Sequence, residues 1–168
     1  IYLLLLFIII VSQFNKIITP LIIMSSIILS TIGVFLGLLI FNMDFVVVMT
    51  MIGVISLIGI VVNNAIVLID FIELNRKRKI LNGSKSSEME IILDSITEAG
   101  RTRLRPVILT ALTTILGLMP LAIGMNFDFV NFFKSYELTF YLGGDNMVFF
   151  GPIAWAIIFG LTFATFLT

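Results

Sequence analysis

The fold of this chain is decided by one stretch, Gly53-Val54-Ile55-Ser56-Leu57-Ile58-Gly59-Ile60-Val61-Val62-Asn63-Asn64-Ala65-Ile66-Val67-Leu68-Ile69-Asp70-Phe71-Ile72. No charged side chain occurs over residues 45–69. That interval is longer than the roughly 20 apolar residues that an α-helix needs to cross about 30 Å of hydrocarbon. A buried helix of a water-soluble protein is the alternative, but such a helix would be expected to expose a polar face to water. The stretch therefore predicts a transmembrane helix over about 44–72.

Other charge-free intervals surround this stretch, over residues 1–15, 17–43, 106–127 and 146–168. The 168-residue chain is 60% hydrophobic and 12% charged, against roughly 45–50% and about 25% in soluble globular proteins. We therefore predict an all-α fold, a polytopic membrane helix bundle. Its expected helices are about 1–13 (a partial span), 17–41, 44–72, 104–126 and 147–168. Because residue 1 is Ile and both ends lie in apolar runs, we expect residues 1–168 to be a fragment of a longer protein.

Charge is concentrated in one connection, since eight of the ten Lys and Arg residues fall between Asp70 and Arg105. The positive-inside rule assigns this connection to the cytoplasm and residues 128–145 to the opposite side. Within it, Ser87 and Glu90 have capping-box spacing, and apolar residues follow at helical period. We predict a short amphipathic helix along the membrane surface over about 87–100.

The residue types present exclude most soluble enzyme chemistry. The chain has no Cys and no His, so the usual zinc, iron and haem ligands, a thiol nucleophile, an imidazole base and disulfides are all missing. Ten basic and ten acidic residues give a net charge of 0, which does not favour nucleic-acid binding. An intramembrane enzyme would need a buried acid pair, a Ser/His dyad or a metal cluster. We therefore expect no catalytic residue, no metal, no cofactor and no enzymatic activity.

Polar and small residues form a stripe on each of two predicted membrane helices. At 100° per residue, each stripe covers an arc of roughly 60°. The first stripe consists of Ser56, Gly59, Asn63 and Asp70. The second stripe consists of Arg103, Thr110, Thr114 and Gly117. From the helical rise, Asn63 lies roughly 10 Å inside Asp70 and Thr110 roughly 8 Å inside Arg105, so we expect the stripes to reach similar depths.

Two interpretations of the stripes stay open. Small residues allow close helix approach, and Asn or Thr can hydrogen-bond across an interface for about 0.6–2 kcal/mol without any catalytic duty. Gly59 and Gly117 would then pack helices, as the GxxxG pattern of Gly33 and Gly37 predicts for the preceding helix. The other interpretation is that the stripes face a proton site. No carboxylate lies inside a charge-free span, so the chain by itself cannot complete such a site.

Further motifs follow the first stretch. The second motif is Arg103-Leu104-Arg105-Pro106-Val107-Ile108-Leu109-Thr110-Ala111-Leu112-Thr113-Thr114-Ile115-Leu116-Gly117-Leu118-Met119-Pro120-Leu121. The last predicted helix opens with Gly151-Pro152-Ile153-Ala154-Trp155. In this order, and separated by the basic connection, these motifs resemble the C-terminal membrane half of the resistance-nodulation-division (RND) efflux transporters. The resemblance extends over essentially the whole chain.

The resemblance implies a proton-coupled secondary active transporter of the bacterial inner membrane that exports drugs or other amphiphiles. Members of the family have twelve transmembrane helices in two halves, large periplasmic domains and a trimeric assembly. They commonly work with a periplasmic adaptor and an outer-membrane channel. The partners implied for this chain are therefore a missing N-terminal half with an Asp pair, its periplasmic domains, two further copies and the lipid bilayer.

The resemblance also implies a proton relay that includes Asn63, Asn64, Arg103 and Thr110. Asn63 occupies the position at which many drug exporters carry a Lys, so the charge balance of the relay differs in this chain. An Asn side chain can still donate to a carboxylate and accept from its protonated form. Two alternatives stay open, namely a structural membrane subunit and a metal-ion or lipid exporter of the same superfamily.

Overall fold

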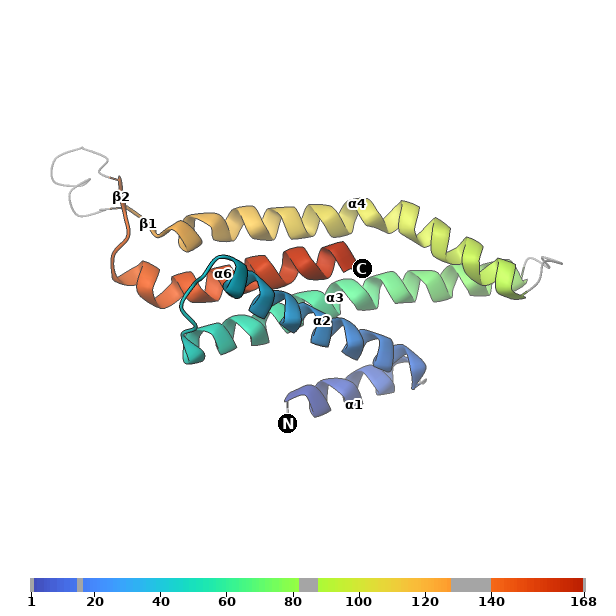
Figure 1. Cartoon of the computed structure of the whole chain (residues 1–168). Coiled ribbons are helices and arrows are strands. Elements are labelled where there is room, and N and C mark those ends of the chain that lie inside the picture. The colour runs from blue at the N-terminus through green and yellow to red at the C-terminus, as the bar shows by residue number, and fades with distance from the viewer. Residues whose placement is uncertain (1, 15–16, 82–87, 128–139, 168) are drawn as a thin grey trace.

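The computed structural model describes residues 2–14, 17–81, 88–127 and 140–167, and Figure 1 shows their arrangement. Four of its helices are long and apolar enough to cross a membrane, and a shorter apolar helix precedes them. The all-α membrane bundle that the sequence predicts is thereby confirmed. The elements in chain order are α1 (Tyr2–Phe14), α2 (Ile18–Ile40), α3 (Val47–Leu81), α4 (Glu88–Ile123), β1 (Met125–Phe127), β2 (Phe140–Leu142) and α6 (Asp145–Leu167).

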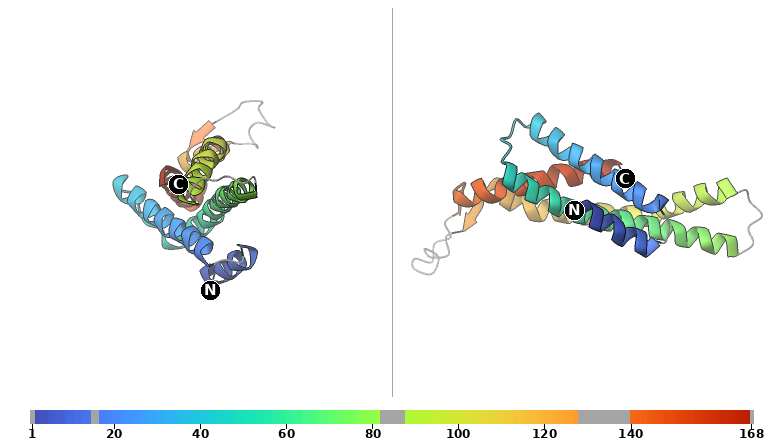
Figure 2. Two further views of the ribbon diagram at one scale, coloured as in Figure 1. Left: turned by 90° about the vertical axis from the view of Figure 1, so that its right-hand side faces the viewer. Right: turned by 90° about the horizontal axis from the view of Figure 1, so that it is seen from below.

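Helix α6 forms the centre of the bundle. It packs against α2, α3 and α4, while α1 packs against α2 at the edge (Figures 1 and 2). Small residues of α6 allow this close packing, because a Cβ atom added at Gly160 would overlap the side chains of Leu57 and Val34. Both of those side chains are fully buried. The core therefore lies along α6 and the facing sides of its three neighbours.

Helices α3 and α4 extend beyond the end of α6, where they lie beside each other as an antiparallel pair (Figures 1 and 2). We call this end of the bundle the basic end, because it includes the run from Arg76 to Lys79 on α3. Helix α3 continues to Leu81, nine residues past the predicted boundary at 72. The side chains that face the partner helix include Asn75, Ser95 and Ala99, all of them buried.

Helix α4 is continuous where the sequence predicted two helices, over about 87–100 and 104–126. Pro106 lies in its interior. A proline inside a helix lacks an N–H group, and its ring clashes with the preceding turn, so it bends the helix without necessarily ending it. Figure 1 shows that α4 is bent along its length. The segment before Pro106 packs against α3, and a pattern of residues along one helix does not contain that contact.

The helix ends at the opposite side of the bundle have specific caps. Asn42 has a φ of 50°, and the amides of Asn42 and Met43 donate to the carbonyls of Leu39 and Leu38, which is a Schellman motif. Gly124, with a φ of 72°, ends α4 and leads into β1, which pairs antiparallel with β2. The sequence did not predict this strand pair.

Candidate functional site

The stripe on α3 lies on an uncovered face of the bundle. Ser56, Gly59, Asn63 and Asp70 are all exposed, and Asn64 beside them is half-buried. On the other side of the same helix, Leu57, Val61 and Ala65 are buried in the core. Helix α3 therefore turns its apolar side to α2 and α6 and leaves its small and polar side without a covering helix among the described residues.

The stripe on α4 is also largely open. Thr110 and Gly117 are exposed, whereas Arg103 and Thr114 are half-buried. The Thr110 hydroxyl donates to the Pro106 carbonyl at 2.8 Å, and the Thr114 hydroxyl donates to the Thr110 carbonyl at 2.8 Å. Because these hydroxyls have used their hydrogens within α4, each can still accept a hydrogen bond on its oxygen.

Arg103 is the charged member of this face and has an unusual environment. Its Cζ atom lies 4.5 Å from the centre of the Phe71 ring on α3. Its Nε atom is buried and has no hydrogen-bond partner. No carboxylate of the described residues forms an ion pair with it. Within the part of the chain that the structure describes, the guanidinium charge is therefore held by an aromatic ring and is not neutralised.

The structure brings some of the predicted site residues together and leaves others apart. Arg103 meets Phe71, the residue after Asp70. No hydrogen bond between described residues joins Asn63 or Asn64 to Arg103 or Thr110. The chain therefore presents a polar face with several separate hydrogen-bonding groups, and these groups do not form a closed network of their own.

The four glycines that the sequence singled out occupy two kinds of surroundings. A Cβ atom added at Gly33 or Gly37 would overlap Phe163 or Phe159 of α6. A Cβ atom added at Gly59 or Gly117 would meet no atom within 4 Å. Gly33 and Gly37 thus lie at a close helix contact, whereas Gly59 and Gly117 lie on the uncovered face.

An ion-pair cluster ties the two helices together at the basic end. The Lys79 Nζ atom on α3 lies 2.5 Å from Asp94 Oδ2 and 3.0 Å from Glu98 Oε2 on α4. The hydrogen bonds to these two carboxylates raise the pKa of Lys79 above its ordinary value of 10.5. The sequence pattern does not single out Lys79 or Phe71, because each one contacts a residue of the other helix. The only sequence signal for Lys79 was the acidic row of Glu90, Asp94 and Glu98 at four-residue spacing.

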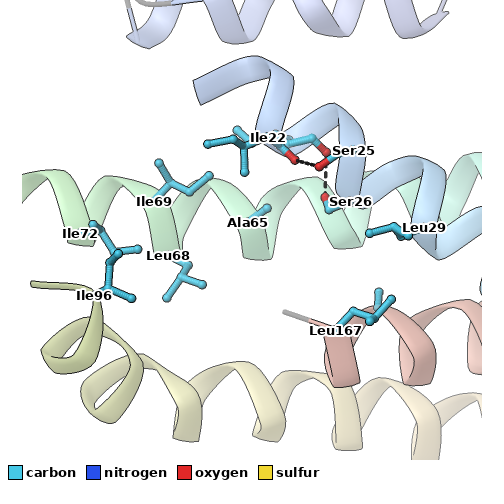
Figure 3. A pocket seen from close by; sticks show the side chains of 12 residues that line it. Ile22, Ser25, Ser26, Leu29, Ala65, Leu68, Ile69, Ile72, Ile96 and Leu167 are labelled. Atoms are coloured by element: carbon cyan, nitrogen blue, oxygen red, sulfur yellow. Dashed lines mark hydrogen bonds between the residues drawn. The ribbon is translucent and has the colours of Figure 1, made fainter. Parts of the chain in front are cut away.

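An apolar cavity of about 360 Å³ lies beside α3, near the end of α6 (Figure 3). Ile22, Ala65, Ile72 and Leu167 are among the residues that line it. The hydroxyls of Ser25 and Ser26, which also line it, donate to backbone carbonyls of their own helix. None of the described residues that line the cavity has a titratable side chain. Ala65 points about 200° away from Asn63 around α3, so the cavity lies away from the polar face.

Among the described residues, no group of three or more Asp or Glu side chains is placed to hold a metal ion. The polar face therefore offers hydrogen-bond donors and acceptors, together with the half-buried guanidinium of Arg103, which has no carboxylate partner among the described residues.

Four apolar helices of spanning length, packed as one bundle, define part of a multi-pass membrane protein. The model of the AcrB/AcrD/AcrF family matches residues 1–126. The chain therefore belongs to this family of RND transporters.

Three relatives show how much of this chain is matched and how much of each relative it covers. The swarming motility protein SwrC of Bacillus subtilis is 37% identical over 118 residues, which cover 70% of this chain and 10% of that protein. The multidrug resistance protein MdtC of Erwinia tasmaniensis is 38% identical over 105 residues, 62% of this chain and 9% of that protein. MdtC of Citrobacter koseri is 32% identical over 149 residues, 89% of this chain and 12% of that protein. The chain thus spans about a tenth of the length of these relatives.

Proposed function

We propose that this chain is the C-terminal transmembrane part of a proton-coupled efflux transporter in the bacterial inner membrane. The observation that carries the proposal is Arg103, whose guanidinium lies on the uncovered polar face without a carboxylate partner among the described residues. A charge in or near the membrane is costly unless it is paired. We infer that the pairing group comes from the rest of the transporter.

The missing N-terminal half, with its Asp pair, is the partner that fits this face. Its carboxylates would pair with Arg103 when ionised and release that charge when protonated, which links proton uptake to movement of the two halves. Asn63 and Asn64 would donate to these carboxylates, and the Thr110 oxygen would accept from the protonated form. Gly59 and Gly117 leave room on the face for close approach of helices from that half.

The proposed cargo and assembly rest on the family relationship. Relatives with the name multidrug resistance protein favour drugs and other amphiphiles as substrates, with lipids or metal ions as the alternative cargo. The working unit would be a trimer that contacts a periplasmic adaptor and an outer-membrane channel. A structural membrane subunit without coupling is the competing function, and the transport experiment below separates the two.

The test is proton-driven efflux in membrane vesicles that hold matched amounts of the complete transporter. We expect Arg103→Lys to lower the rate about 10-fold or more, because a Lys ammonium does not reproduce the two parallel hydrogen bonds of a guanidinium with a carboxylate. Asn63→Leu should also lower the efflux rate of correctly folded protein. A packing role alone predicts only a loss of stability of about 0.6–2 kcal/mol from interhelical hydrogen bonding. Both variants should insert and assemble normally.

The matched control is Arg101→Lys, the same substitution two residues earlier, at an exposed position of α4. It should transport at the wild-type rate. Wild-type rates for Arg103→Lys and Asn63→Leu as well would contradict the relay and leave both residues with a packing role.

A further inference from the structure

Phe71 belongs to a row of α3 residues that faces α4. Phe71, Asn75 and Lys79 are four residues apart and therefore share one side of the helix. Lys79 contacts Asp94 and Glu98, Asn75 is only 7% exposed, and Phe71 lies under Arg103. The antiparallel packing of the two helices thus sets the position of the Phe71 ring relative to the Arg103 side chain.

The contact between Phe71 and Arg103 has a particular chemical consequence. The negative face of an aromatic ring attracts a guanidinium within about 6 Å of its centre without cancelling the positive charge. It also leaves the N–H groups at the planar end of the side chain unbonded. Arg has five N–H donors, and none of them forms a hydrogen bond with a described residue, while only the Nε atom is buried.

A carboxylate at the position of Phe71 would act differently. It would neutralise the guanidinium and occupy two of its donors, so that a second carboxylate from outside the chain would bind more weakly. An aliphatic side chain would pack but would exert no electrostatic attraction on the cation. Only a ring holds the guanidinium in place and keeps both its charge and its donor groups available.

We propose that Phe71 is a positioning residue for Arg103: its ring orients the guanidinium so that the planar fork is free to receive a carboxylate of the missing half. This inference rests on the proposed function, because it assigns the use of Arg103 to proton coupling. It adds a residue of α3 to the site, and that residue touches neither the carboxylate nor the transported molecule.

The test changes the electron density on the face of the Phe71 ring and keeps the shape of the side chain nearly the same. In the complete transporter, Phe71 is replaced by phenylalanine bearing one, two or three fluorine atoms, which withdraw electrons from the face of the ring. We expect the efflux rate to fall step by step with fluorination. Phe71→Leu should lower it about 2- to 30-fold, the range that loss of a cation–π contact allows, and Phe71→Trp should retain most of it.

Phe163 on α6 is the matched control. It is also half-buried, it packs against Gly33, and neither α2 nor α6 contains a Lys or Arg residue. Fluorination at Phe163 should leave the rate unchanged. A role of Phe71 in packing alone predicts the same insensitivity to fluorine and better tolerance of Leu than of the bulkier Trp, and that result would overturn the proposal.

Arg103→Ala separates the proposed function of Arg103 from the proposed role of Phe71. A wild-type efflux rate for Arg103→Ala would overturn the proposed function of Arg103, and with it the reason for positioning it. A transporter that requires Arg103 but does not respond to fluorine or to Leu at position 71 would overturn the role of Phe71 and leave the proposed function standing. We expect the efflux rate to fall both in Arg103→Ala and on fluorination of Phe71, and to stay unchanged on fluorination of Phe163.

Discussion

Single small residues decide how closely the helices of this bundle approach one another. At Gly160, the space for a Cβ atom is already occupied by Leu57 and Val34, which are buried and cannot move aside at low cost. At Gly117, the same added atom would meet nothing within 4 Å. Two glycines in apolar helices of the same chain therefore have opposite tolerance for one methyl group.

We expect Gly160→Ala to destabilise the folded chain by about 1–3 kcal/mol, the usual cost of overpacking a well-packed interior. Gly117→Ala in the same 168-residue chain, which lacks the proposed helices of the other half, is the control and should be neutral or slightly stabilising, because Ala favours helix over Gly by roughly 1 kcal/mol. The measurement is the loss of helical circular dichroism on titration with denaturing detergent. Equal shifts for the two variants would show that α6 does not pack as described.

At the level of elements, α3 and α4 are longer than a membrane span requires. Their 35 and 36 residues correspond to about 52–54 Å, against about 30 Å of hydrocarbon. The excess forms the antiparallel pair at the basic end, which Lys79 holds through two carboxylates one turn apart on α4. Since Phe71 and Arg103 lie on the same two helices, this pair also aligns part of the proposed site.

The Lys79 cluster should respond to pH in one direction. The pKa of Lys79 is raised in the folded state. The stabilisation that its ion pairs give to the contact between α3 and α4 is therefore fully present below pH 10.5, and it is lost as the pH rises through the higher pKa of the folded state. The chain has no Cys, so spin labels can be attached at Arg78→Cys and Leu93→Cys alone. We expect a narrow distance distribution at pH 7 that broadens above pH 10.5 and also broadens at pH 7 in Lys79→Met.

Lys77→Met is the matched control for that experiment. The described partner of Lys77 is Glu73, at 3.8 Å on the same helix, so this ion pair does not join α3 to α4. The distribution should stay narrow in Lys77→Met at pH 7. A Lys79→Met variant as narrow as the wild type would mean that apolar packing around Asn75, Ser95 and Ala99 holds the pair without the ion pairs.

At the scale of the whole molecule, the bundle covers one side of α3 and leaves the other open. The covered side faces α2 and α6, and the open side carries the polar stripe. The chain spans about a tenth of the length of its relatives, and under the proposed function this open side is where the rest of the transporter would pack.

The orientation of the bundle in the membrane is testable with single cysteines. The positive-inside rule predicts that Leu81, at the basic end, faces the cytoplasm and that Asp44, at the other end, faces the periplasm. In right-side-out vesicles, an impermeant thiol reagent should label Asp44→Cys at once and Leu81→Cys only after permeabilisation. The reverse pattern would contradict the predicted orientation.

The sequence by itself determined which stretches are apolar enough to span a membrane and which polar residues share one side of a helix. Absence of charge over residues 45–69 requires a helix in hydrocarbon, since every backbone polar group there must be bonded within the segment. The helical period then places Asn63 with Asp70, and Arg103 with Thr110, whatever the helices pack against. These are local properties of one helix, so a linear pattern is sufficient to predict them.

Only the tertiary structure decided what each of these faces meets. Gly37 and Gly59 look alike in the sequence, yet one lies under Phe159 and the other lies against open space, because the rotation of each helix about its axis depends on its neighbours. Phe71 contacts Arg103 only because α4 lies beside α3, and the segment of α4 before Pro106 is paired with α3 through Lys79. Contacts between helices depend on how the helices cross, and crossing geometry is a property of the packed bundle as a whole.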